Sequence, residues 1–226
     1  MTEQDLSNWM LCGPVGETRL VGAYCRLEPY VAEQHGDDLF TAVGGPDNDD
    51  LWTYVPAGPY RHARELNATL DHTRTLRDWR TMVIVDALDG AVLGMASYMR
   101  RRPEHGCVEV GCVVFSRALQ RTRIATETLY LMARHVFDDL GYRRFEWKCN
   151  AANAASMRAA VRFGFTFEGI FRNDMVVKGQ NRDTAWYSMI DSEWPDIKAA
   201  FQTWLDAGNF DGAGRQRVKL ATSTAG

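Results

Sequence analysis

Residues 119–149, LQRTRIATETLYLMARHVFDDLGYRRFEWKC, decide the fold of the chain. The stretch begins with a loop rich in Gln, Arg and Thr, continues as an amphipathic helix with apolar residues three and four apart, and ends in a strand. Gly141 is placed to end the helix. Because the first N–H groups of a helix lack partners and carry partial positive charge, donors gathered there suit an anion, usually a phosphate.

Strands and helices alternate on both sides of this stretch, which indicates an α/β fold. We expect strands at 19–30, 81–87, 91–100, 107–115, 143–149, 165–172 and 183–190. We expect further helices at 31–43, 61–74, 153–163 and 192–206, the last with a serine cap. Asp89-Gly90 predicts a hairpin turn, and the almost wholly apolar strand 107–115 is expected to be buried on both faces.

Length and composition indicate one domain, residues 1–206, followed by a disordered tail, residues 207–226, rich in Gly, Ala, Ser and Thr. A net charge of −3 gives no reason to expect nucleic-acid binding. Five scattered cysteines and five histidines without ligand spacing favour a reducing cytoplasm and no metal site. No secretory signal or membrane-spanning apolar run is visible. We therefore expect a cytoplasmic monomer or homodimer that binds neither nucleic acid nor membranes.

The order strand, anion loop, helix and strand occurs in several nucleotide-binding designs, but the Walker and dinucleotide glycine motifs are both missing. The segment instead resembles the acyl-CoA-binding core of the GNAT superfamily of N-acetyltransferases. The family's Gln/Arg-x-x-Gly-x-Gly/Ala loop is matched at Gln120 and Ala125, with Arg123 where glycine is usual. Asn153-x-x-Ser156 and Gly164-Phe165 resemble the RimJ/RimL group, and the resemblance extends from residue 19 to residue 206.

The resemblance implies a mixed, mostly antiparallel and twisted sheet flanked by helices, with CoA bound at a splay between central strands. It also implies direct transfer of an acetyl group from acetyl-CoA to a primary amine in a ternary complex. The cofactor-binding positions that it implies are Val113, Val114, Phe115, Gln120, Arg121, Thr122, Arg123, Ile124, Ala125, Thr126, Asn153 and Ser156. For Arg121 and Arg123 the alternative is a solvated position at the helix start, although positive charge there opposes the helix dipole.

Two residues are catalytic candidates. Glu109 lies within the apolar strand, where a carboxylate is costly unless it is used or paired, and the family often places a base acting through water on this strand. Pairing with an arginine, or a place at the strand edge, is the alternative. Ser156 is the candidate acid, because the RimJ/RimL pattern puts this serine by the CoA sulfur; an ordinary first-turn position is equally open. Asn153 can cap the same helix.

The acceptor pocket is least determined by the sequence. Trp52, Tyr54 and Tyr60 lie in a loop with several acids and could hold a cationic amine, or they could anchor the loop on the core. Arg182, Asp183 and Trp186 on the last hairpin could line the same mouth or hold its strands together. The oxyanion donor is expected to be a backbone N–H group of residues 111–114.

Ionisation favours an α-amine as the acceptor. Removing a proton at pH 7 costs about 1.0–1.4 kcal/mol for an α-amine and over ~4 kcal/mol for a lysine. We therefore predict transfer to an α-amine of a protein N-terminus or of a small metabolite. The alternatives are a detoxifying acetyltransferase for an amine toxin, antibiotic or aminoacyl conjugate, a CoA-sensing domain without turnover, and a nucleotide-binding protein.

Overall fold

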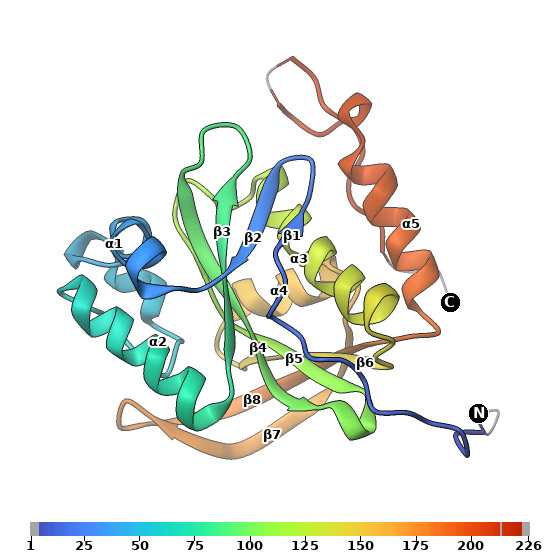
Figure 1. The fold of residues 1–226 in the computed structure, drawn as a ribbon, viewed down its shortest axis with the longest axis horizontal. Helices are drawn as coiled ribbons and strands as arrows, with labels where there is room; N and C mark the ends of the chain where they lie inside the picture. Colours follow the sequence, from blue (N-terminus) through green and yellow to red (C-terminus); the bar gives the residue numbers. More distant parts are fainter. Residues whose placement is uncertain (1–4, 213, 223–226) are drawn as a thin grey trace.

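The computed structural model describes residues 5–212 and 214–222, which form one mixed sheet with helices on both faces (Figure 1). The eight strands lie in the order β1-β2-β3-β4-β5-β6-β8-β7. Their bounds are Leu20–Val21 (β1), Cys25–Pro29 (β2), Arg80–Asp86 (β3), Val92–Arg102 (β4), Cys107–Phe115 (β5), Arg144–Asn150 (β6), Thr166–Val177 (β7) and Gln180–Ile190 (β8). The α-helices are Ala32–Val43 (α1), Ala63–Arg77 (α2), Arg123–Arg134 (α3), Ala154–Arg162 (α4) and Trp194–Leu205 (α5).

The pairing of β5 with β6 is parallel, and the other neighbouring strands pair antiparallel. A parallel pair needs a crossover, and α3 supplies it between these two strands. The mixed, mostly antiparallel sheet flanked by helices is the fold class predicted from the sequence, which is therefore confirmed.

The central strands β5 and β6 pair over only part of their length. Cys107–Val110 pair with Arg144–Trp147, after which each strand continues without the other. The register between β4 and β5 shifts nearby, and Cys112 takes a left-handed φ of 47°, as at a β-bulge. The two strands therefore splay beyond Val110, and the β6-facing edge of residues 111–115 has no strand partner in β6.

Two apolar clusters fix the layers. One lies between the sheet and the helices α3, α4 and α5, and the other lies between α1, α2 and the strands β3 to β5. Figure 1 shows α1 and α2 on one side of the sheet and α3 and α5 on the other, with the β7–β8 hairpin extending beneath α2. The central strand β5 is buried over most of its length, as its sequence predicts.

Some predicted elements differ in detail. Residues 19–30 form a two-strand hairpin, because Glu127 of α3 accepts the backbone N–H groups of Ala23, Tyr24 and Cys25 at 2.7 Å each and holds the turn. Helix α5 begins after Glu193, so the serine cap was wrong. After α3 the chain makes a π-helical turn, His135–Asp139, before Gly141 at a φ of 68°.

The C-terminal segment, residues 207–212 and 214–222, packs on α4 and α5. Trp204 of α5 donates its indole N–H to Gln216 Oε1 at 2.8 Å and contacts the ring of Phe210. Thr222 Oγ1 donates to the carbonyl of Arg162 at 3.1 Å. The composition predicts a disordered tail here, whereas aromatic and hydroxyl contacts anchor the described part of this weakly apolar segment. Residues 213 and 223–226 of the predicted tail lie outside the described residues.

Three further observations concern the described ranges 5–212 and 214–222. None of their helices combines the length and apolar character needed to cross a membrane. No group of three or more His, Cys, Asp or Glu side chains in these ranges is placed to hold a metal ion. All five cysteines are free thiols.

Candidate active site at the splay between β5 and β6

The loop before α3 lies at the end of β5. Gln120 Nε2 donates to the carbonyl of Phe115 at 3.1 Å, which ties the loop to the strand. Thr122 caps α3, since its Oγ1 accepts the N–H of Ala125 at 3.2 Å. The exposed Arg121 takes a left-handed φ of 63°, a conformation that non-glycine residues adopt rarely. The loop thus presents the start of α3 beside the splayed strands.

Arg123 lies between two aromatic rings. Its guanidinium carbon is 4.7 Å from the ring centre of Tyr24 and 4.5 Å from that of Phe210. These distances are typical of cation–π contacts. Arg123 is therefore more than a solvated surface residue, and it joins the β1–β2 turn to the C-terminal segment.

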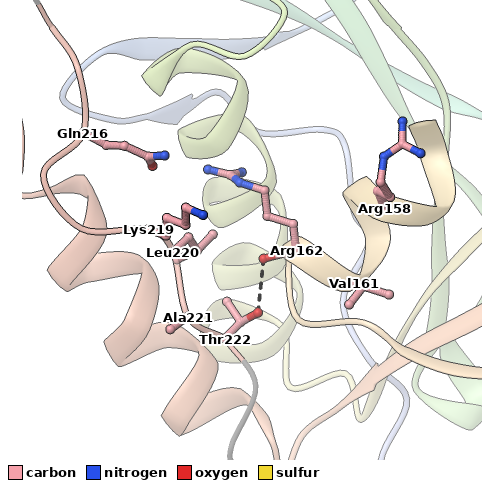
Figure 2. Close-up of a pocket in the computed structure, with 8 residues that line it drawn as sticks. All are labelled: Arg158, Val161, Arg162, Gln216, Lys219, Leu220, Ala221 and Thr222. Atoms are coloured by element: carbon pink, nitrogen blue, oxygen red, sulfur yellow. Dashed lines mark hydrogen bonds between the residues drawn. The ribbon is translucent and has the colours of Figure 1, made fainter. Parts of the chain in front are cut away.

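A cationic cavity of about 320 Å³ lies between α4 and residues 216–222 (Figure 2). Arg158, Arg162 and Lys219 line it, and its lining within residues 5–212 and 214–222 includes no acidic side chain. Figure 2 shows the Arg162 side chain directed toward Gln216 and Lys219. Burial lowers the pKa of Arg162 from its usual value. These charges suit an anionic group such as a phosphate.

The cavity is connected to the loop at the start of α3. Arg162 Nη1 donates to Thr126 Oγ1, in the first turn of α3, at 3.1 Å. Sequence reasoning missed the cavity because five of its eight lining residues come from the segment that was expected to be disordered. The local signal that could have indicated the cavity is the spacing of Arg158 and Arg162, which are four residues apart and so share one face of the helix.

Ser156 and Asn153 meet at the start of α4. Asn153 Oδ1 accepts the N–H of Ser156 at 3.0 Å, which confirms the predicted cap. Trp147 Nε1 donates to Ser156 Oγ at 3.0 Å. Because Trp147 is the last β6 residue that pairs with β5, the serine hydroxyl lies beside the splay.

Glu109 is 2% exposed and lies two residues before the splayed segment. Its Oε1 is 2.6 Å from Arg100 Nη1, and its Oε2 is 2.9 Å from Lys148 Nζ. A Cβ atom on Gly111 would lie 3.1 Å from Glu109 Oε1, so the glycine leaves room for the carboxylate. The arginine pairing that the sequence left open is therefore present, and the carboxylate also stands next to the splay.

The ion pairs continue across β6. Lys148 Nζ also contacts Glu146 Oε2 at 2.8 Å, and Glu146 binds Arg102 and Arg144 through its other oxygen. Burial alone would raise the pKa of the Glu146 carboxyl, but Lys148 and Arg144 outweigh it and hold that pKa below its usual value. The two buried carboxylates of this face, Glu109 and Glu146, thus each contact at least two cations, although Glu109 Oε2 makes an ion-pair contact without a hydrogen bond.

Three side chains of β8 lie on this face without hydrogen-bond partners. Arg182 Nε, Thr184 Oγ1 and Trp186 Nε1 are buried, and none of them has a hydrogen-bond partner among residues 5–212 and 214–222. Asp183 behaves differently, because it accepts from the backbone of Asn173 at 2.8 Å and holds the hairpin. Of the two roles that the sequence left open, Trp186 packs on Phe171 of β7 with 4.5 Å between ring centroids, so it helps to hold the two strands together. The Arg182 Nε has no hydrogen-bond partner among the described residues.

The aromatic loop is mostly part of the core. Trp52 is 1% exposed and donates its indole N–H to the carbonyl of Val43 at 2.7 Å, and Tyr60 packs against its ring. Both rings pack in the apolar cluster between α1, α2 and the sheet, and so they anchor the loop. Tyr54, at 39% exposed, remains accessible. Lys178 Nζ donates to the carbonyl of Trp52 at 2.8 Å, so the β7–β8 hairpin contacts this loop.

Comparisons with known proteins agree with this architecture. The family model described as acetyltransferase (GNAT) domain matches residues 26–166. The structure of a GCN5-related N-acetyltransferase from Brucella melitensis is 43% identical, covers 95% of this chain and 97% of its own, and superposes with a TM-score of 0.90. A GNAT-family structure from Chromobacterium violaceum ATCC 12472 is 39% identical, with 86% and 97% coverage and a TM-score of 0.80.

A curated relative from Bacillus subtilis (strain 168) carries the name "Putative ribosomal N-acetyltransferase YdaF". It is 26% identical over 110 residues, which are 49% of this chain and 60% of the relative. The match therefore spans less than two thirds of that protein. The family model covers more than half of the chain described above. The chain belongs to the GNAT family of acetyltransferase enzymes.

Proposed function

We propose that the protein transfers an acetyl group from acetyl-CoA to an α-amine, by direct attack while both substrates are bound. The observation that carries the proposal is the splay between β5 and β6. Anion-binding groups lie at the start of α3 and along α4, and a buried carboxylate lies beside the splay. The splay would thus be the passage in which donor and acceptor meet.

The residues present fit the coenzyme that the family uses. The N–H groups at the start of α3, together with Arg121, would hold the pyrophosphate. Arg162 and Lys219 would hold a further phosphate in the cationic cavity. The unpaired edge of residues 111–115 would bind the amides of the pantetheine arm as a strand binds its neighbour. Bound in this way, acetyl-CoA supplies the acetyl group as a thioester.

The protein's own side chains and backbone would donate and accept the protons and hydrogen bonds of the reaction. Glu109 would accept the proton of the amine through a water molecule. Backbone N–H groups of residues 111–114 would donate to the acetyl oxygen. Ser156 Oγ, oriented by the Trp147 indole, would give a proton to the departing sulfur. The Lys148 and Arg100 cations beside Glu109 disfavour a protonated amine nearby, which helps the amine to lose its proton.

The α-amine is favoured by its ionisation and by one relative. An α-amine at pH 7 is already partly neutral, so a base acting through water suffices for it. The name of the Bacillus subtilis relative refers to a ribosomal N-acetyltransferase, which is consistent with a protein N-terminus as the acceptor. The five free thiols support the cytoplasm as the compartment.

A thiol-release assay with acetyl-CoA tests the proposal. The acceptors are short peptides with free N-termini, free amino acids, polyamines, aminoglycosides and a lysine ε-amine on an N-blocked peptide, with product masses read directly. We expect acetylation of α-amines. Acetylation confined to the ε-amine, polyamine or aminoglycoside would contradict the α-amine, and acetyl-CoA binding without any product would indicate a CoA-sensing domain. Calorimetry with acetyl-CoA and ATP checks the donor, and a preference for ATP would contradict it.

A further inference from the structure

Arg182 is a mostly buried cation on β8. It is 8% exposed, and its Nε is buried without a hydrogen-bond partner among the residues that the structure describes. A buried guanidinium that is not paired is costly, and such groups are rare in folded proteins. Burial and the nearby Arg100 cation lower the pKa of Arg182 from its usual value. The position of Arg182 therefore calls for an anion that the chain itself does not supply.

The carboxylates near Arg182 already have other partners. Glu109 is within electrostatic range of Arg182, but its two oxygens bind Arg100 and Lys148. Asp183, the next residue along β8, accepts from the backbone of Asn173. Asp174 acts on Arg182 only at long range and is exposed on β7. Pairing within the described chain thus leaves a positive charge on this face.

Two further buried donors lie on the same strand face. Side chains alternate along a strand, so Arg182, Thr184 and Trp186 project to one side of β8. Thr184 Oγ1 and Trp186 Nε1 are buried and lack partners in residues 5–212 and 214–222, as does Arg182 Nε. The Trp186 ring packs on Lys148 Nζ at 3.8 Å, which places this row of donors against the Glu109–Lys148 pair. A carboxylate, with two acceptor oxygens, matches a guanidinium flanked by neutral donors.

The row lies where an acceptor would enter. Thr184 pairs with Asn150 of β6, beyond the last β6 residue that pairs with β5, so Arg182 lies at the open part of the splay. The β7–β8 hairpin that carries it contacts the Trp52 loop through Lys178. Arg182 is thus on the face of Glu109, opposite to the helices α3 and α4 that carry the coenzyme groups.

We propose that Arg182, assisted by Thr184 and Trp186, binds a carboxylate of the acceptor and makes the enzyme selective for α-amines with a carboxylate close to the amine. The inference rests on the proposed transfer to α-amines and adds the class of acceptor. The carboxylate could be the main-chain group of a free amino acid or the side chain of an N-terminal Asp or Glu. A polyamine, which carries only positive charge, should be the poorest acceptor on this cationic face.

Two acceptor pairs distinguish these sources. The first pair is Asp-Ala-Ala-amide and Asn-Ala-Ala-amide, which differ in the side-chain carboxylate alone. The second pair is free asparagine and asparagine amide, which differ in the main-chain carboxylate. Rates are compared at equal concentrations of unprotonated amine, so that differences between the pKa values of the acceptor amines do not affect the comparison. In the pair that differs in the recognised carboxylate, we expect kcat/KM for the carboxylate acceptor to exceed kcat/KM for its amide partner by about tenfold to a hundredfold. This is the range of a charge-assisted hydrogen bond.

Arg182→Gln should remove this preference. Its kcat/KM for the carboxylate acceptor should fall to that of the amide acceptor, while the amide value and the KM for acetyl-CoA stay unchanged. Arg182→Lys should restore part of the preference, and Thr184→Val should reduce it. Arg172→Gln, which changes an exposed arginine on the neighbouring strand β7, is the matched control and should behave as wild type. The inference would be overturned if the ratio of kcat/KM for the carboxylate acceptor to kcat/KM for the amide acceptor were the same in wild type and Arg182→Gln. Equal losses of kcat/KM for both acceptors in Arg182→Gln would overturn it as well.

Calorimetry in the presence of CoA separates recognition from turnover. Tighter binding of the carboxylate peptide that disappears in Arg182→Gln supports the inference even if no acceptor is acetylated, and in that case the proposed function fails alone. Acetylation of carboxylate and amide acceptors at equal kcat/KM leaves the proposed function standing and overturns the inference.

Discussion

Lys148 Nζ lies 2.9 Å from Glu109 Oε2, in a contact where both side chains are 3–7% exposed. The candidate base is therefore held by a lysine from the strand on the far side of the splay. The same ammonium group contacts Glu146 at 2.8 Å, so one cation joins two buried carboxylates of adjacent strands. Only Glu109 lies on β5, the strand whose free edge borders the splay.

This arrangement provides a matched test of the base. Glu109→Gln and Glu146→Gln each remove one buried carboxylate from Lys148, so their effects on stability should be similar. Glu109→Gln should in addition lower kcat/KM by about a hundredfold or more, the usual contribution of a general base, and shift the rise of the rate with pH upward. Steady-state rates from pH 6 to 9 check this. Equal rate losses in both variants would mean that Glu109 has only a structural role.

Ser156→Ala should lower kcat with little change in the affinity for acetyl-CoA, because the hydroxyl is needed when the sulfur departs. Trp147→Phe keeps the serine but removes the indole N–H that orients it, so a smaller loss of kcat is expected. Rapid-mixing kinetics measure kcat, and calorimetry measures the affinity for acetyl-CoA separately. Wild-type kcat in Ser156→Ala would assign the proton to water.

Acetyl-CoA binding should depend on cationic side chains at two sites, the loop before α3 and the cavity beside α4. Arg121→Glu should weaken acetyl-CoA binding by at least about tenfold, as expected for loss of a charge-assisted contact of about 1.5–3 kcal/mol with added repulsion. Arg162→Gln should weaken it by about tenfold to a hundredfold. CoA without its ribose 3′-phosphate is the control, because its affinity should respond to Arg121→Glu but not to Arg162→Gln. Equal responses to both ligands would place the 3′-phosphate outside the Arg162 cavity.

Glu127→Gln should destabilise the fold without changing catalysis directly. The carboxylate accepts three backbone N–H groups of the β1–β2 turn, and an amide would present a donor to one of them. A buried donor without a partner costs about 1–3 kcal/mol, which urea unfolding can measure. Glu17→Gln is the control, since Glu17 is exposed. Equal stabilities in the two variants would show that the turn holds without the carboxylate.

Removal of residues 207–226 should impair both stability and coenzyme binding. Trp204 is 5% exposed and would lose the ring of Phe210 and the side chain of Gln216, which should cost about 1.5–3 kcal/mol. Lys219→Gln tests the charge alone and should weaken acetyl-CoA binding while leaving the thermal midpoint unchanged. A truncated protein with wild-type affinity and midpoint would contradict a role for the segment.

Local features of the site could be predicted from the sequence, and features that depend on distant pairing could not. The cap at Asn153 involves residues within one helical turn, so spacing alone indicated it. The contact of Lys148 with Glu109 depends on the parallel register of β5 and β6, which no local pattern records. The same holds for Arg182, whose lack of a partner is visible only after β6, β7 and β8 are in place.

Composition alone also did not indicate the packing of two segments. The loop of residues 44–60 is rich in Gly, Pro and Asp, so its aromatic residues looked available for an acceptor, but Trp52 fills the core between α1 and the sheet. The segment after residue 206 is poor in apolar residues, yet Phe210 contacts the Arg123 side chain and Thr222 donates to the backbone carbonyl of Arg162, both far away in the sequence.

The short pairing of β5 with β6 also has a mechanical consequence. Within the described residues, strand pairing between β5 and β6 is limited to four residue pairs. A ligand that hydrogen-bonds along the free edge of residues 111–115 would therefore add backbone contacts between the two parts of the sheet where strand pairing is short. Bound coenzyme should therefore slow hydrogen exchange on both sides of this short pairing at once, and the enzyme would reach its full rigidity only when loaded.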